Sequence, residues 1–152
     1  MAAALPNIIL EDVSLRDGLQ SEPKLLSLED KSAVFELLAS AGFERVQVGS
    51  FVNPRVVPQM ADMEALIERI SGRYPHATLT ALVLNEKGLE RAMRCRLDHL
   101  SISVSASDTH SRKNARVSAD EALKGAAELI SKASASGVRV RAGLQCAFGR
   151  VD

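Results

Sequence analysis

Apolar, β-branched runs alternate along this chain with segments in which apolar residues recur every three or four positions. Alternation of strands with helices is typical of β-α units, which build a parallel sheet with helices packed against it. The pattern therefore predicts an α/β fold. We expect strands near residues 7–13, 45–50, 78–84, 99–105 and 138–146.

The first two helices are predicted from stripes at i, i+3, i+4 and i+7, a spacing that places four side chains on one helix face. Ser27 is a typical helix cap, and Gly42 and Gly72 are suited to end the two helices. We expect both stripes to pack against the sheet. The first stripe is Val34, Leu37, Leu38 and Ala41, and the second is Met63, Leu66, Ile67 and Ile70.

Two further helices are predicted on either side of the fourth strand. A short helix runs over residues 86–94. The last helix opens with Ser118 and Glu121, a capping-box pair whose side chains satisfy the first free amides, and it ends at Gly137. Because no linker, low-complexity segment or charge block divides the chain, we expect one domain or part of one.

Composition excludes several classes of partner. The chain has 19 basic and 19 acidic residues, so no summed field favours nucleic acid or an anionic membrane surface. No apolar run approaches the length of a membrane span, and the first residues lack the basic and apolar regions of a signal peptide. We therefore expect a cytoplasmic protein. Cys95 and Cys146 form no metal-binding spacing.

The first candidate for chemistry follows the first apolar run, where Arg16, Asp17 and Gly18 stand together. A carboxylate is a hard oxygen ligand suited to Mg²⁺ or Mn²⁺, and a guanidinium can stabilise a developing oxyanion. Glycine allows a sharp turn beside a ligand. The alternative is that Arg16 and Asp17 form a surface ion pair in an ordinary turn.

A second motif, residues 50–62 (SFVNPRVVPQMAD), follows the second apolar strand. Together the two motifs resemble the 3-hydroxy-3-methylglutaryl-CoA lyase family, within a superfamily of metal-dependent lyases and acyltransferases that have a TIM-barrel fold. The resemblance spans the chain. It continues through residues 85–88 (NEKG), 105–108 (SASD), 113–114 (KN) and 145–149 (QCAFG).

The resemblance implies an incomplete (β/α) TIM barrel, because a whole barrel has eight units and about 250 residues. About five strands and four helices are expected here, so residues 1–152 are interpreted as the N-terminal portion of a single (β/α)8 catalytic domain. A self-contained five-strand domain is the alternative. The first and fifth strands would lack partners on one side, and such edges favour pairing with another chain. We therefore expect a homo-oligomer.

For function, the resemblance implies a divalent-metal-dependent retro-Claisen cleavage of a 3-hydroxyacyl-CoA into acetyl-CoA and a keto acid. Asp17 is the implied metal ligand, and Arg16 and Gln20 are the implied catalytic residues. Arg16, Ser50 and Asn114 are the implied substrate contacts. For Gln20 and Ser50 a helix cap or turn is the alternative role, and for Asn114 a turn. The His-x-His pair of the family is missing, so the chain by itself is expected to be inactive.

One departure from the family pattern leaves the substrate open. The lyases have a glutamate three residues before the serine of the second motif, and this chain has Gln47. An amide carries no charge and accepts no proton. Gln47 is expected to be either a core amide or a changed rim residue. The alternative functions are a condensing acyltransferase or aldolase of the same superfamily, and a non-catalytic assembly module.

Overall fold

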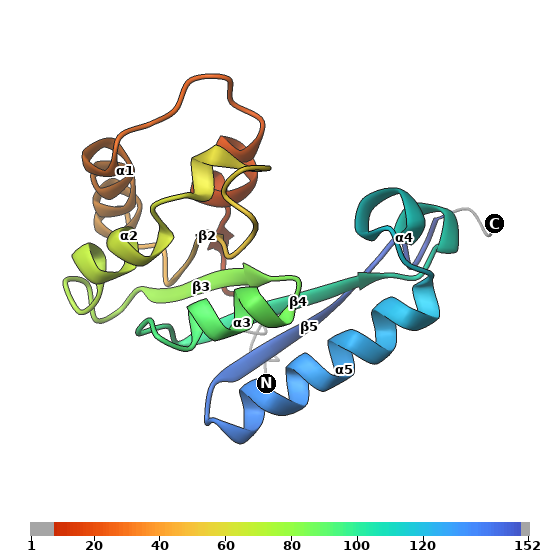
Figure 1. The fold of residues 1–152 in the computed structure, drawn as a ribbon. Coiled ribbons are helices and arrows are strands. Elements are labelled where there is room, and N and C mark those ends of the chain that lie inside the picture. Colours follow the sequence, from red (N-terminus) through yellow and green to blue (C-terminus); the bar gives the residue numbers. More distant parts are fainter. Residues whose placement is uncertain (1–7, 150–152) are drawn as a thin grey trace, which may run out of the picture.

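The computed structural model describes residues 8–149, which form a curled parallel sheet with helices on its outer face (Figure 1). The five strands lie in sequence order. This is the fold class predicted from the alternating pattern, an incomplete barrel. The strands are β1 (Glu11–Asp12), β2 (Arg45–Ser50), β3 (Thr78–Val83), β4 (His99–Ser105) and β5 (Arg139–Gln145).

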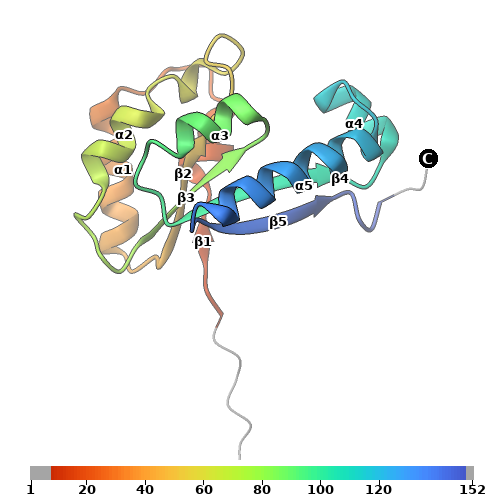
Figure 2. The same cartoon turned by 60° about the horizontal axis from the view of Figure 1, so that its bottom comes forward.

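The helices cover one face of the sheet, and Figure 2 shows α5 lying along β4 and β5. Helices α1 and α2 pack together over β2, and α3 packs on β3. The α-helices are α1 (Leu28–Ser40), α2 (Met63–Ile70), α3 (Glu86–Ala92), α4 (Asp108–Ala115) and α5 (Ala119–Ala135). Two short helical turns complete the described chain, the π-helical η1 (Ser14–Gly18) and the 3-10 turn η2 (Pro58–Met60).

The apolar core lies between the sheet and these helices. Successive residues of a strand point to opposite faces, and the outward set of β2 to β4 is almost fully buried against the helices. The stripe predicted for α2 is confirmed, because all four of its side chains are about 1% exposed. The buried strand residues are Val46, Val48, Leu79, Ala81, Val83, Leu100 and Ile102.

The stripe predicted for α1 is only partly right, because Val34 and Leu38 pack against the core but the most buried side chains of the helix are others. Leu37 is 71% exposed, whereas Phe35 and Ala39 are each 1% exposed. Lys31 on the same face is also buried, because its ammonium finds a carboxylate partner from the segment before α2. The contact with α2 therefore decides which face of α1 is buried, and simple apolar spacing does not reveal it.

Two local predictions also need correction. The strand expected near residues 7–13 pairs only at Glu11–Asp12, since the chain enters η1 two residues later; residue 7 lies outside the described residues. The segment after β4 forms α4, which was not predicted because it has no apolar stripe. Both capping boxes are present, at Ser27 and at Ser118.

No helix in the described part of the chain is long and apolar enough to cross a membrane.

Candidate active site

The turn after β1 positions the Arg-Asp pair. In η1 the carbonyl oxygen of Val13 accepts from the amides of Arg16 at 3.1 Å, Asp17 at 2.8 Å and Gly18 at 3.4 Å. Leu15, inside this turn, is 2% exposed and anchors it in the core. Such single π-turns are rare and frequently lie at functional sites. The turn thus holds Arg16 at the carboxyl end of β1.

The Arg16 side chain is fixed on two sides. Its Nε donates to Gln47 Oε1 at 2.6 Å, and its Nη1 donates to Asp17 Oδ1 at 2.6 Å. Nη2 has no protein partner within residues 8–149, so one edge of the guanidinium is available to a ligand. Gln47, only 1% exposed, is both a core amide and the residue that orients Arg16.

The second sequence motif fixes the loop that follows Gln20. Gln59 is 4% exposed, and its side-chain amide Nε2 donates to the carbonyls of Glu22 at 3.1 Å and Lys24 at 2.6 Å. Its Oε1 accepts from the amide of Leu26 at 3.4 Å. A buried amide with these partners satisfies the loop backbone where strand pairing is absent. Gln59 is therefore a clamp on the rim loop.

An ion pair between the buried Lys31 and the partly exposed Asp62 holds Gln59 in place. Lys31 Nζ donates at 2.6 Å to Asp62 Oδ1 and also at 2.6 Å to the carbonyl oxygen of Gln59. The Lys31 side chain is 5% exposed and that of Asp62 is 30% exposed. Removing one partner of such a pair leaves a poorly solvated charge. The motif residues Gln59 and Asp62 thus tie α1 to the rim.

The loop after β2 is held from the side of α3. Arg91 makes a bidentate pair with Glu64, at 2.6 and 2.8 Å, and donates to the carbonyl of Val52 at 3.1 Å. Its guanidinium carbon lies 5.4 Å from the centre of the Phe51 ring. The hydrogen bonds from Arg91 lower the pKa of Glu64 against a smaller effect of burial, and they raise the pKa of Arg91.

Asn85 lies at the end of β3 and caps α3, because its Oδ1 accepts from the amide of Gly88 at 2.9 Å. Gly88 is required by close packing, since a Cβ at this position would lie 2.4 Å from the carbonyl oxygen of Phe51. The cap brings Asn85 to the same rim as Arg16. Its side chain lines the cleft described below.

Helix α4 adds a pair of polar side chains to the rim. The Asn114 amide Nδ2 lies 2.7 Å from His110 Nε2, one helical turn away. When the amide donates, Nε2 of the ring is the acceptor and the ring hydrogen lies on Nδ1. That nitrogen is buried and, like the hydroxyl of the neighbouring Ser111, has no hydrogen-bond partner in the described part of the chain.

One cleft of about 850 Å³ brings several of these side chains together. Of the site residues predicted from sequence, it is lined by Arg16, Gln20 and Asn114. Asn85 and His110 line it too. In the sequence, only the i, i+4 spacing of His110 to Asn114 points to this position. Clefts of this size accommodate small-molecule ligands and cofactors.

Two predicted site residues do not line this cleft. Ser50 is completely buried, and its hydroxyl has no hydrogen-bond partner among residues 8–149. The side chain of Asp17 is 65% exposed and pairs with Arg16. The structure therefore brings together Arg16, Gln20 and Asn114 but not the other two.

The other wall of the cleft lies between α3 and α5. Glu86 on α3 accepts a hydrogen bond from Lys132 Nζ on α5, and both residues line the cleft. The hydrogen bond lowers the pKa of Glu86 and raises the pKa of Lys132. Apolar groups of Ala126 and Leu129 lie beside the pair. The cleft is therefore polar at the barrel rim and partly apolar toward α5.

The described residues do not form a complete binding site for a divalent metal ion. No group of three or more His, Cys, Asp or Glu side chains within residues 8–149 can hold one. Asp17 has the right chemistry, but one of its oxygens is engaged by Arg16. This carboxylate alone does not meet the ligand number that Mg²⁺ or Mn²⁺ requires.

Comparison with known proteins identifies close relatives. The family model described as HMGL-like matches residues 7–151. Hydroxymethylglutaryl-CoA lyase YngG of Bacillus subtilis is 33% identical over 142 residues, which are 93% of this chain and 47% of that protein. The (R)-citramalyl-CoA lyase of Chloroflexus aurantiacus is 39% identical over 125 residues, covering 76% of this chain and 39% of the relative.

Solved structures give the same result. The HMG-CoA lyase of B. subtilis superposes with a TM-score of 0.88 at 33% identity, covering 94% of this chain and 48% of that one. An HMG-CoA lyase from A. baumannii, in complex with coenzyme A and 3-methylmalate, has a TM-score of 0.89 at 28% identity and covers 100% of this chain and 51% of that one. The chain thus spans about half the length of the proteins that it matches.

Proposed function

Because the chain belongs to the HMGL-like family, we propose that it forms the acyl-CoA-binding part of a carbon–carbon lyase. The reaction is a retro-Claisen cleavage of a 3-hydroxyacyl-CoA to acetyl-CoA and a keto acid. The observation that carries the proposal is the shared cleft, where Arg16, Gln20 and Asn114 meet from separate elements. Residues 1–152 act in this proposal as the N-terminal portion of one (β/α)8 catalytic domain.

Arg16 stabilises the charge that forms when the bond breaks. A base takes the proton from the substrate hydroxyl, and the carbon–carbon bond breaks so that the hydroxyl carbon becomes the carbonyl of the keto acid. The electron pair of the broken bond leaves with an acyl-CoA enolate, whose oxygen is the former thioester carbonyl, and protonation of the enolate carbon gives acetyl-CoA. The free Nη2 of Arg16 donates to this oxygen, and Gln47 holds the guanidinium in place. Such a preorganised donor contributes roughly 10²- to 10³-fold to the rate.

Asn114 and Gln20 bind the substrate beside this oxygen. The contact with His110 fixes the amide nitrogen of Asn114, so the side-chain carbonyl oxygen of Asn114 is held in one orientation. A divalent cation, when bound, acidifies the substrate hydroxyl, and Asp17 is the ligand that this chain contributes. Residues 8–149 offer too few metal ligands for turnover, so we expect the 152-residue protein to bind the thioester without cleaving it.

Calorimetric titration with acetyl-CoA tests the binding function. We expect saturable binding that Arg16→Gln weakens about tenfold, since a hydrogen bond to a charged group contributes about 1.5–3 kcal/mol. Arg55→Gln is the matched control, because Arg55 is exposed, does not line the cleft and carries the same charge. Equal weakening by both variants, or no saturable binding, contradicts the proposal.

An assay of the reaction separates the lyase from its alternatives. With Mg²⁺ and 3-hydroxy-3-methylglutaryl-CoA, we expect no acetyl-CoA from the 152-residue protein. Steady release of acetyl-CoA would mean that the site is complete without further ligands. Consumption of acetyl-CoA with a keto acid would favour a condensing enzyme instead.

A second substrate has specific support. The similarity to (R)-citramalyl-CoA lyase reaches 39% identity, compared with 33% for YngG, although over a shorter stretch. A citramalyl-CoA is cleaved by the same type of reaction, and Gln47 in place of the lyase glutamate removes a charge beside Arg16. Titration with 3-hydroxy-3-methylglutaryl-CoA and with a citramalyl-CoA shows which of the two thioesters binds more tightly. The cytoplasmic location and the homo-oligomer remain predictions.

A further inference from the structure

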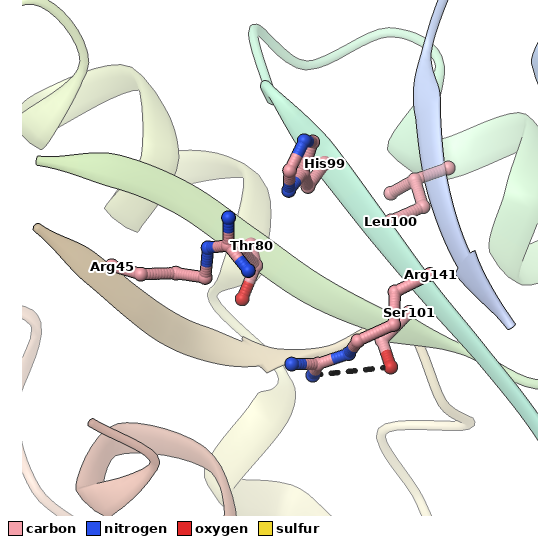
Figure 3. A pocket seen from close by; sticks show the side chains of 6 residues that line it. All are labelled: Arg45, Thr80, His99, Leu100, Ser101 and Arg141. Carbon is pink, nitrogen blue, oxygen red and sulfur yellow. Dashed lines mark hydrogen bonds between the residues drawn. The ribbon is translucent and has the colours of Figure 1, made fainter. Parts of the chain in front are cut away.

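The inner face of the sheet carries a cluster of polar side chains at the end opposite to Arg16. We call it the basal cluster: Arg45, Thr80, His99, Ser101 and Arg141 (Figure 3). Arg45 and His99 are the first residues of β2 and β4, whereas Arg16 follows the last residue of β1. The cluster surrounds a cavity of about 10 Å³, which is room for one water-sized atom.

The cluster has more cationic than anionic groups. Glu11 is its one carboxylate partner in the described chain, accepting from Thr80 Oγ1 at 2.7 Å and from Arg141. Arg45 has no such partner, and its Nε is buried without any hydrogen bond among residues 8–149. A buried donor without an acceptor costs about 1–3 kcal/mol. The cluster therefore lacks an acceptor beside Arg45.

Two further residues that can donate hydrogen bonds, Ser101 and His99, line the same cavity. The Ser101 hydroxyl oxygen accepts from Arg141 Nη2 at 3.4 Å, so its own hydrogen remains to be donated. His99 lines the cavity, and its pKa is lowered by burial and by the charges of Arg139 and Arg45, which outweigh the opposing charge of Asp98. The surroundings of His99 are thus electropositive as well as partly dry. All of these features favour a negatively charged occupant.

We propose that the basal cluster binds a small oxyanion, a carboxylate or a phosphate, with one oxygen in the cavity between Arg45, Ser101 and Arg141. The cavity admits a single oxygen atom, so the remaining atoms of the anion lie outside it. Arg45 and Arg141, which both line the cavity, supply the positive charge that attracts this oxygen. This site lies at the other end of the strands from the proposed acyl-CoA cleft and does not depend on that function.

Nuclear magnetic resonance titration of the 152-residue protein tests the proposal. Sodium acetate and sodium phosphate, each replacing sodium chloride at constant ionic strength, are the two probes, which keeps general screening unchanged. We expect saturable shifts of the Arg45 Nε–H and the His99 ring. Bound anion also raises the pKa of His99, because a nearby negative charge favours the protonated ring. The tighter probe identifies the class of oxyanion.

Matched variants separate the site from general charge effects. Arg45→Gln weakens binding about tenfold, as expected for a lost charged donor. Arg73→Gln leaves the affinity unchanged, although it removes the same charge, because Arg73 pairs with Glu36 on the outer face. If Arg45→Gln does not fold by circular dichroism, Ser101→Ala replaces it and weakens binding several-fold. Unsaturated shifts, or equal affinities in the Arg45 and Arg73 variants, overturn the proposal.

Discussion

Strands β2 and β5 are both covered by helices on one face, yet they differ sharply in burial. In β2 every residue from Val46 to Ser50 is buried, whereas β5 contains no buried residue. β2 lies between two strands, whereas among residues 8–149 β5 pairs only with β4. Its Leu144 is 59% exposed. A strand of this sheet is therefore buried by its neighbours on both sides, and a covering helix alone does not suffice.

This contrast indicates where the stability of the chain lies. The first three strands, with α1 to α3, combine an apolar core with the buried polar ties of Gln59 and Lys31. Around β5 fewer apolar groups are buried. The free energy of local opening is lower where fewer apolar groups are buried. We expect the two regions to respond very differently to equivalent substitutions.

The largest difference is expected between core truncations in the two regions. Phe35→Ala removes a ring that is 1% exposed and packs edge-on against Tyr74, which should cost about 3–5 kcal/mol of unfolding free energy. Leu144→Ala removes a side chain that is 59% exposed and should cost less than about 0.5 kcal/mol. Urea unfolding followed by circular dichroism measures both. Similar costs would remove the contrast.

A smaller effect is expected from the rim clamp. Gln59→Ala leaves the carbonyls of Glu22 and Lys24 without their donor, which should cost about 1–3 kcal/mol. Hydrogen exchange of the Leu26 amide should accelerate most, because Gln59 Oε1 is its acceptor. Gln145→Ala, at the exposed end of β5, is the control and should change neither. Unchanged exchange at Leu26 would show that the loop is held by other contacts.

The smallest effect concerns pH. The pKa of Glu64 is lowered from 4.5 in the folded protein by hydrogen bonds from Arg91, so this carboxylate stabilises the fold above its unfolded pKa. The contribution is lost as pH falls through the lower folded pKa. The Glu64 side chain is 44% exposed, so solvent screening keeps it below about 1 kcal/mol.

Glu64→Gln should therefore make the loss of unfolding free energy between about pH 5 and pH 3 shallower. Arg91→Gln should flatten the same part of the curve, because Arg91 is the main cause of the pKa shift. Thermal unfolding in buffers of equal ionic strength measures both curves. An unaltered slope in both variants would assign the acid sensitivity to other carboxylates.

Local signals in the sequence predicted much of the fold. The stripe of α2 and the capping box at Ser118 are confirmed, because both depend on spacing within one helix. Arg16 was predicted at the rim because the Arg-Asp pair follows an apolar run and a second motif follows the next strand, and Arg16 does line the cleft. The chemical role given to Arg16 remains a prediction.

Features that depend on contacts between distant segments were not accessible. Lys31 is buried only because Asp62, 31 residues away, reaches its ammonium, and this contact helps to rotate α1 away from the expected stripe. Helix α4 has no apolar face, so its pairing of His110 with Asn114 had no signal beyond the capping serine and the i, i+4 spacing. Packing partners thus decide what periodicity leaves open.

The ion pair between Glu11 and Arg141 joins the first strand to the fifth across 130 residues. Contacts of such sequence separation generally arise late in folding because loop closure is entropically costly, so we expect this pair to form after the intervening strands have assembled. Weakening this pair should then accelerate unfolding while leaving the refolding rate nearly constant. The ion pair between Glu11 and Arg141 would thus slow the unfolding of the assembled sheet.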